Sequence, residues 1–206
     1  IDIEHCRDDA VRLEHAIAGS WLNRSIGGAT TKKELTAILE QSAETVVGVE
    51  LLLRAQIELA APALGHFKRQ EAEESVERLG PVIQRAKRGG LKLIHGRALV
   101  LQGMARFALD SPLSRQTLQL GFELARSNCD VLNEAIAREY LARIAIRGKE
   151  PGGFMEAGAH LEEAYTVFFR LGDQIARDRV ERLLRECGAS PSKIDELTSR
   201  ISLPPP

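Results

Sequence analysis

Long polar side chains followed four positions later by an arginine are the residues in this sequence best suited to recognition chemistry. Three pairs of this kind lie offset from an apolar stripe that repeats along the chain: Gln102 with Arg106, Glu139 with Arg143, and Glu181 with Arg185. The planar guanidinium group presents several N–H donors in a fixed geometry, which suits a carboxylate or a row of backbone carbonyls. We therefore predict that these six residues contact a protein or peptide partner. The alternative is that Glu139 and Arg143 pair with each other on a solvated helix face.

Trp21 is a further candidate for contact with a partner. It is the only tryptophan, and it lies beside Leu22 in a stretch rich in glycine, serine and asparagine. Tryptophan is enriched among the residues that contribute most to protein–protein binding. We predict Trp21 as a partner-binding residue, and the alternative is that its ring closes one end of a helical stack.

Catalytic or metal-binding sites need titratable groups that converge, and this sequence offers few of them. The five histidines are scattered over different segments: His5, His15, His66, His95 and His160. Near His5, only Cys6, Asp9 and His15 could add ligands, and a solvated N-terminal helix explains this group better than a metal site with three or four ligands does. The glycine pairs lack the Gly-x4-Gly-Lys-Ser/Thr spacing that cradles phosphate, and we interpret them as helix stops. Cys187 falls on an apolar stripe, so we expect a buried structural thiol. The sequence predicts no catalytic residue, cofactor or metal, and therefore no enzyme.

Composition excludes further classes of function. The 206 residues include 28 basic and 29 acidic ones, for a net charge of -1, which gives no basic excess for binding nucleic acid. No apolar run approaches the roughly 20 residues that cross a bilayer, so we expect no membrane insertion. Three widely separated cysteines without a CxxC spacing suit a reducing, cytoplasmic environment. The chain begins at Ile1 rather than Met, so we expect it to be a piece of a longer polypeptide, with a processed natural product as the alternative.

Apolar residues recur with helical periodicity along almost the whole chain. Turn-forming residues separate the expected helices, which cover residues 4–20, a long stretch that ends before Pro62, 70–88, 91–109, 112–127, 131–147, 154–171, 174–187 and a short segment near 193–201. A capping box at Thr31 and Glu34 opens the long stretch. Gly80 and Pro81 either kink or split the 70–88 helix. Ser111 is the expected N-cap of the 112–127 helix, with Pro112 in its first turn.

An apolar pattern repeats on these helices. Trios at i, i+4 and i+7 occur on alternate helices: Leu79, Ile83 and Ala86; Leu118, Phe122 and Ala125; Ala164, Phe168 and Leu171. Quartets recur on the intervening helices at shifts of 40 and 39 residues: Leu101, Met104, Ala105 and Ala108; Leu141, Ile144, Ala145 and Gly148; Val180, Leu183, Leu184 and Cys187. A weaker copy is Leu52, Ala55, Gln56 and Leu59. Small residues in the stripe let neighbouring backbones approach, and one helix pair cannot bury the stripe alone, so successive pairs must stack.

Residues 161–188 carry a family resemblance. The segment runs Leu161-Glu-Glu-Ala-Tyr-Thr-Val-Phe-Phe-Arg-Leu-Gly-Asp173 and, after Gln-Ile, Ala176-Arg-Asp-Arg-Val-Glu-Arg-Leu-Leu-Arg-Glu-Cys-Gly188. It resembles the closing end of tetratricopeptide arrays found in large bacterial signalling proteins, attached to cyclase, kinase or STAND-type ATPase modules. The period here exceeds the usual 34 residues, and the Leu-Gly pair expected in each first helix is missing.

The predicted fold is therefore all-α, an antiparallel helix-pair solenoid of divergent tetratricopeptide-like kind. We expect an N-terminal helical extension at 1–42, the array at 43–188 and a polar C-terminal tail at 189–206. The resemblance implies a scaffold or regulatory sensor module of a larger signalling protein. Such a module binds a protein segment, or a second copy as a homodimer, along the concave face of its first helices. The alternative is a ligand-gated sensor that binds a small molecule or signal peptide in the groove.

Overall fold

The structure is a computed structural model that describes residues 49–62, 67–148 and 152–202, together with the isolated positions 11, 14, 17, 36 and 37. The predicted N-terminal helix, Trp21 and most of the following segment lie outside the described residues. Within the described residues the chain is entirely helical and contains no strand. The prediction of an all-α protein is confirmed.

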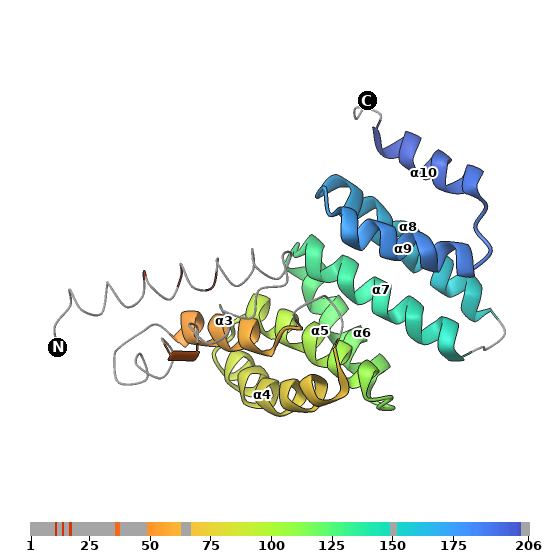
Figure 1. The fold of residues 1–206 in the computed structure, drawn as a ribbon. Coiled ribbons are helices and arrows are strands. Elements are labelled where there is room, and N and C mark those ends of the chain that lie inside the picture. Colours follow the sequence, from red (N-terminus) through yellow and green to blue (C-terminus); the bar gives the residue numbers. More distant parts are fainter. Residues whose placement is uncertain are drawn as a thin grey trace, which may run out of the picture.

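Eight helices are described in order: α3 (Val49–Ala60), α4 (Arg69–Arg88), α5 (Lys92–Ala108), α6 (Ser114–Ser127), α7 (Val131–Gly148), α8 (Gly153–Arg170), α9 (Gln174–Glu186) and α10 (Pro191–Ser202). We call α3, α5, α7 and α9 the first helices and α4, α6 and α8 the second helices. From α4 to α10 their bounds match the sequence predictions within two residues, and the predicted start of the long stretch before Pro62 lies outside the described residues. Each helix packs against the next from α3 to α9, and contacts also join α3 to α5, α5 to α7 and α8 to α10. The helices therefore progress from α3 and α4 at one end to α10 at the other (Figure 1).

Two predictions about helix interiors and ends are resolved by the structure. Residues 69–88 form one continuous helix with Pro81 inside it, so the chain is not split there. Pro81 and Glu77 are both exposed, which lets water reach the carbonyl that loses its partner when proline lacks an N–H. The prediction that Ser111 caps α6 is wrong, because the helix begins at Ser114 after a further turn. The Ser111 hydroxyl accepts instead from the Leu113 N–H at 3.4 Å.

Five helices end in the same way, with one residue in the left-handed conformation followed by a backbone bond to the carbonyl five residues earlier. The left-handed residues are Gly90, Asp110, Cys129, Gly172 and Gly188. The corresponding bonds run from Leu91 to Ala86, Ser111 to Arg106, Asp130 to Ala125, Asp173 to Phe168 and Ala189 to Leu184. This Schellman-type end satisfies carbonyls that would otherwise lack partners and turns the chain sharply. It explains why the helix ends could be read from the sequence.

The α5–α6 pair approaches most closely at its glycines. A Cβ added at Gly103 would lie 2.5 Å from Leu118 Cγ, and one added at Gly121 would lie 2.8 Å from the Val100 backbone nitrogen. Leu118 and Val100 are themselves buried. The two backbones pack at a distance that only glycine allows, and neither glycine belongs to the predicted apolar stripe.

The buried apolar residues form two clusters that meet at α7. One extends from α3 to α7 and the other from α7 to α10. On α7, Tyr140 and Leu141 belong to the first cluster, whereas Ala142 and Ala145 belong to the second. The second-helix trios are buried with one exception: Leu171 is 51% exposed because α8 ends at Arg170. The prediction that Leu171 belongs to the core is therefore wrong.

The C-terminal segment folds onto the preceding helices. α10 confirms the helix expected near residues 193–201, and it packs against α8. Ile194 and Leu197 are buried, and the Tyr165 and Thr198 hydroxyls lie 3.0 Å apart. Among the described helices, none combines the length and apolar character needed to cross a membrane.

Candidate functional site

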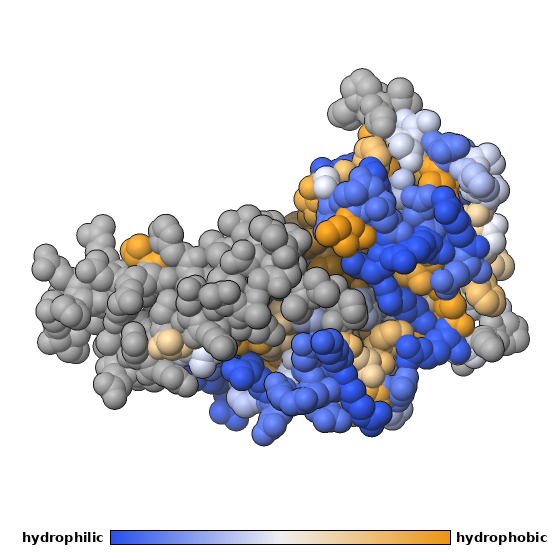
Figure 2. Space-filling view, viewed as in Figure 1, coloured by the Kyte–Doolittle hydropathy of each residue, from blue (hydrophilic) through white to orange (hydrophobic). Residues whose placement is uncertain are grey.

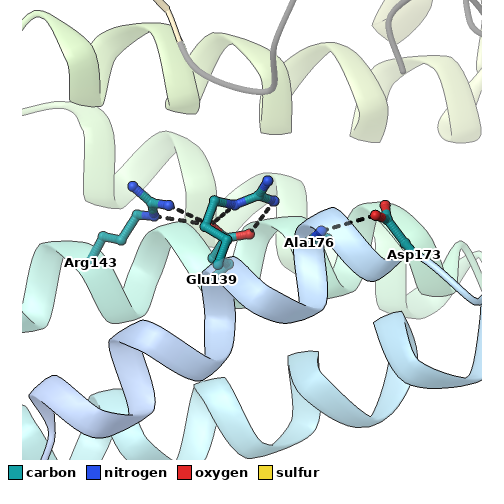
Figure 3. Close-up of polar contacts among 5 residues, drawn as sticks. Glu139, Arg143, Asp173 and Ala176 are labelled. Atoms are coloured by element: carbon teal, nitrogen blue, oxygen red, sulfur yellow. Dashed lines mark hydrogen bonds and ion pairs between the residues drawn. The ribbon is translucent and has the colours of Figure 1, made fainter. Parts of the chain in front are cut away.

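A carboxylate held between two arginines links α7 to α9. Glu139 on α7 is 0% exposed. Its Oε1 accepts hydrogen bonds from Arg143 Nη2 at 2.7 Å and Nε at 3.0 Å, as Figure 3 shows. Arg179 on α9 donates from Nε to Oε1 at 2.6 Å and from Nη2 to Oε2 at 2.7 Å. Glu139 thus bonds to one arginine on its own helix and to one on the next first helix.

The start of α9 is fixed by a short sequence signal. Gly172 adopts the left-handed conformation that ends α8, with φ of 69°. Asp173 then caps α9, because its Oδ1 accepts from the Ala176 N–H at 2.9 Å (Figure 3). The cap sets the rotational register of α9, and Arg179 lies six residues further along. The Leu-Gly-Asp sequence therefore positions the arginine that reaches Glu139.

Burial alters the protonation chemistry around Glu139. Burial alone would lower the pKa of Arg179, but the hydrogen bonds and charge of Glu139 outweigh it and raise that pKa above its ordinary value. Burial, together with the charge of Glu139, also raises the pKa of Tyr140. The raised pKa of Arg179 favours its charged form, which pairs with Glu139, and the raised pKa of Tyr140 favours its neutral form.

Two aromatic rings and a third arginine extend the cluster toward the C-terminal end of α5. The rings of Phe107 and Tyr140 meet edge to face, with centroids 5.6 Å apart. The guanidinium of Arg143 lies 5.1 Å from the Tyr140 ring centroid, and that of Arg147 lies 4.0 Å from the Phe107 centroid. Arg147 also pairs with Asp110. Cation–π contacts and ion pairs together hold each guanidinium in one orientation.

We call Phe107, Tyr140, Arg143, Arg147 and Arg179 the arginine face. Its three arginine side chains are 24%, 56% and 22% exposed in chain order. Glu139 and Asp110 form ion pairs with these arginines, and the charge of Asp173 also acts on Arg179. Figure 2 shows hydrophilic residues across the region of α7 and α9, interrupted by smaller hydrophobic patches. The face thus offers oriented guanidinium groups, partly exposed and next to aromatic rings.

The predicted recognition residues do not all lie together. Glu139 and Arg143 belong to the cluster, but Glu139 is buried and bonds internally. Gln102 is 5% exposed, and its amide lies 3.4 Å from the Val76 carbonyl. Arg106 bonds to Thr117 on α6.

Glu181 and Arg185 pair with each other on α9, with side chains 25% and 57% exposed. Trp21 lies outside the described residues. Of the six predicted residues that the structure describes, Arg143 is the one that the arginine face includes.

Sequence reasoning missed Phe107, Tyr140, Arg147 and Arg179. The repeat contained a signal for them, since Arg147 follows Phe107 by 40 residues and Arg179 follows Glu139 by 40 residues. Arg147 Nη1 reaches the Phe107 carbonyl at 3.5 Å, and Arg179 reaches the Glu139 carboxylate. Arg147 is thus one repeat shift from Phe107, whereas Arg179 lies one residue beyond the shift from Glu139, and both contacts join neighbouring first helices.

The described residues contain no group of three or more His, Cys, Asp or Glu placed to hold a metal. Burial and, to a smaller degree, Lys87 lower the pKa of His95, and burial with Arg138 lowers that of His160. A lowered pKa favours the neutral form of both histidines. Cys187 is partly exposed with its pKa raised by burial, which makes a poor nucleophile.

No family model, curated protein or solved structure matches this chain. The function is therefore argued from the geometry of the arginine face and the packing of the helices that carry it.

Proposed function

We propose that this chain is a protein-interaction module, a divergent tetratricopeptide-like solenoid whose first helices bind a segment of another protein. The arginine face is the observation that carries the proposal. It joins three successive first helices, α5, α7 and α9, through contacts between residues 40 positions apart in the sequence. A segment bound along this face would touch several repeats at once, which is how helical-repeat proteins use their extended surfaces.

The chemistry of the face favours an acidic segment. Arg143, Arg147 and Arg179 each keep part of the side chain exposed, most of all Arg147 at 56%. Their guanidinium groups are already oriented by rings and carboxylates, so binding costs little side-chain entropy. Carboxylates of Asp, Glu or a chain terminus match the geometry of such donors. The rings of Phe107 and Tyr140 add apolar surface beside the charges.

Binding at this face also reaches the contact between helices. Arg143 and Arg179 come from different helices and share Glu139. A ligand carboxylate that draws either arginine outward changes the bond joining α7 to α9. The proposal is that such a change passes along the array to the rest of a larger cytoplasmic signalling protein, for which this chain is the scaffold or sensor module.

A peptide-binding assay tests the proposal directly. Fluorescein-labelled decapeptides that are acidic, neutral or basic are titrated with the whole chain, and anisotropy is recorded at low and high salt. We expect the acidic peptides to bind most tightly and to weaken as salt increases. Arg147→Glu should reduce the affinity at least tenfold, whereas Arg200→Glu on α10, where the side chain is 65% exposed, should not.

Two results would count against a protein ligand. Equal binding of acidic and basic peptides, or equal effects of the two charge reversals, would show that the arginine face is not the site. Stabilisation of the fold by a small metabolite, with none by any peptide, would support the sensor alternative instead.

A further inference from the structure

Positive charge is unevenly distributed along the chain. Between Glu77 and Asp110 the sequence holds seven basic residues and no acidic one, although the whole chain has a net charge of -1. Two of the seven are engaged, since Arg97 pairs with Asp130 and Arg106 bonds to α6. The other five are exposed, and none forms an ion pair with a described residue: Arg78, Arg85, Lys87, Arg88 and Lys92. The proposed function does not use these charges.

The same pattern recurs wherever a second helix turns into a first helix. The last turns of α4, α6 and α8 hold exposed basic residues without an ion pair to any described residue: Arg85, Lys87 and Arg88 on α4, Arg126 on α6 and Arg170 on α8. The first turn of the helix that follows exposes an aliphatic side chain each time. These are Leu93 at 39%, Val131 at 51% and Ile175 at 64%.

The three turns lie on one side of the array. At the starts of α5 and α7, Arg97 Nε lies 2.8 Å from Asp130 Oδ2, so the turns before these two helices are neighbours. The helices α6 and α8 run in the same direction, because Arg115 contacts Glu156 near their starts and a ring contact joins their middles. Their last turns therefore lie on the same side as each other.

Acidic residues at these turns are already engaged. The Asp130 side chain is 7% exposed and pairs with Arg97, and Asp173 caps α9. On the opposite side of the array, by contrast, Arg115 and Arg147 each pair with a carboxylate. We call the side with unpaired cations the basic edge, formed by Arg85, Lys87, Arg88, Lys92, Arg126 and Arg170 together with the aliphatic Leu93, Val131 and Ile175.

Helix stability explains only part of the basic edge. The helix dipole favours cations at the ends of α4, α6 and α8. Lys92, however, is the first residue of α5, where the dipole opposes a cation, and the first turn of α5 holds no acidic residue. The exposed aliphatic side chains also add nothing to the core. Cations beside exposed aliphatic residues are typical of surfaces that lie against anionic lipid headgroups.

We propose that the basic edge binds the surface of an anionic membrane. The cations contact the charged headgroups, while Leu93, Val131 and Ile175 enter the headgroup layer. A flat surface can meet all three turns at once. Proteins that bind single-stranded nucleic acid stack bases on aromatic rings, whereas these three residues are aliphatic. The arginine face includes none of these residues, so this inference goes beyond the proposed function and does not depend on it.

The acidic part of α4 limits how the chain can sit on the membrane. Glu73, Glu74 and Glu77 are exposed on the same helix as the cations. Glu77 precedes Arg88 by eleven residues, which is about 16 Å along a helix and roughly twice the Debye length at physiological salt. We expect α4 to stand steeply, with its C-terminal end at the headgroups and its glutamates in solution.

Vesicle sedimentation with the whole chain tests the inference. The vesicles contain phosphatidylcholine alone, or phosphatidylcholine with about one third phosphatidylserine. We expect the chain to bind the anionic vesicles only and to be released as salt increases. Because the whole chain has a net charge of -1, such binding requires a local concentration of cations.

Charge reversal locates the contact. Lys87→Glu combined with Arg88→Glu should lower the vesicle partition coefficient at least tenfold, since each cation near an anionic membrane contributes roughly fivefold. Arg69→Glu combined with Arg185→Glu is the matched control, because these side chains are 79% and 57% exposed at the opposite ends of α4 and α9. The control changes the net charge equally and should lower the coefficient about twofold or less. Circular dichroism checks that each variant keeps its helix content.

A second pair of variants tests the aliphatic contribution. Ile175→Ser should lower the partition coefficient about fivefold or more, because an apolar side chain no longer enters the headgroup layer. Met155→Ser is its control, since Met155 is 82% exposed at the start of α8, and this variant should bind like the natural chain.

Three results would overturn the proposal: a natural chain that ignores anionic vesicles, equal losses in the two charge-reversed variants, or equal losses in Ile175→Ser and Met155→Ser. A chain that ignores the vesicles but binds a mixed-sequence DNA would assign the basic edge to nucleic acid instead.

Discussion

The α5–α6 pair and the α7–α9 contact hold neighbouring helices together by opposite means. Gly103 and Gly121 bring α5 and α6 so close that an added Cβ would overlap buried atoms of the facing helix. Between α7 and α9, long side chains cross the gap, and the fully buried Glu139 accepts four hydrogen bonds from two arginines. The first contact is apolar and lies within a helix pair, whereas the second is ionic and joins successive pairs.

The two contacts differ in how readily they can change. Close-packed backbones have one arrangement and tolerate little change in volume. A buried ion pair adds little net stability compared with apolar packing, but it is costly to break and can respond to other charges nearby. We therefore expect the α5–α6 pair to be a rigid unit and the α7–α9 contact to be the place where the proposed charged ligand acts.

The largest expected effect comes from breaking the ionic contact. Glu139→Ala leaves Arg143 and Arg179 without their shared carboxylate. We expect the free energy of unfolding to fall by about 3 kcal/mol, measured by urea denaturation. Glu181→Ala is the matched control, since Glu181 pairs with Arg185 near the surface of α9, and its loss should cost about 0.5 kcal/mol or less.

A further variant separates charge from packing at the same position. Replacing Glu139, Arg143 and Arg179 together by leucine removes the charges in one step and should recover most of the stability lost in Glu139→Ala. Equal losses of unfolding free energy in Glu139→Ala and Glu181→Ala would contradict the proposal that buried Glu139 contributes more to stability than Glu181.

Disturbing the apolar contact between α5 and α6 should lower the free energy of unfolding by less. In Gly121→Ala the new Cβ would lie 2.8 Å from both the nitrogen and Cγ2 of Val100. Overpacking of this kind should lower the free energy of unfolding by about 1 to 2 kcal/mol, even though alanine favours helix more than glycine does. The measurement is again urea denaturation.

Gly158 on α8 supplies the control, because nothing lies within 4 Å of a Cβ added there. Gly158→Ala should stabilise the protein by about 0.5 to 1 kcal/mol through helix propensity alone. If both substitutions changed the free energy of unfolding in the same direction, the close approach of α5 and α6 would not explain the glycine at position 121.

Acid should weaken the junction between α6 and α8. The edge of His160 faces the Phe122 ring, with centroids 6.5 Å apart, and Arg138 lies over the same ring at 4.9 Å. Burial and Arg138 lower the pKa of His160, Arg115 lowers it further, and Glu156 opposes them. Below a pH of about 6.5 the unfolded chain therefore takes up a proton that the folded chain refuses, and stability falls.

Melting temperatures between about pH 5 and pH 8 measure this effect. His160→Gln should show a shallower fall on the acid side than the natural chain. His95 contributes in the same direction, because its pKa is lowered too, so some slope should remain. An unchanged slope in His160→Gln would assign the acid sensitivity to other groups.

Local chemistry explains which features the sequence could predict. Helix ends were readable because Gly90, Gly172 and Gly188 adopt the left-handed conformation that their residue type favours. The start of α6 could not be predicted in this way. Asp110 adopts the left-handed conformation although it is not glycine, and the chain makes a further turn before Ser114. Likewise, the spacing of Glu139 and Arg143 is the same on a buried helix face as on a solvated one. Only the position of α9 distinguishes the buried face from a solvated one. Nothing in the sequence of the arginine-rich α9 marks Arg179 as the residue that faces Glu139.

The central claim is that the arginine face binds an acidic protein segment, and arginine side-chain NMR tests it most directly. Nε–Hε signals are assigned by substitution and followed while an acidic decapeptide is added to the whole chain. The account predicts that the signals of Arg143, Arg147 and Arg179 shift together and saturably, while those of Arg69 and Arg200 stay in place. A peptide that binds without moving those three signals, or that shifts all five alike, would contradict it.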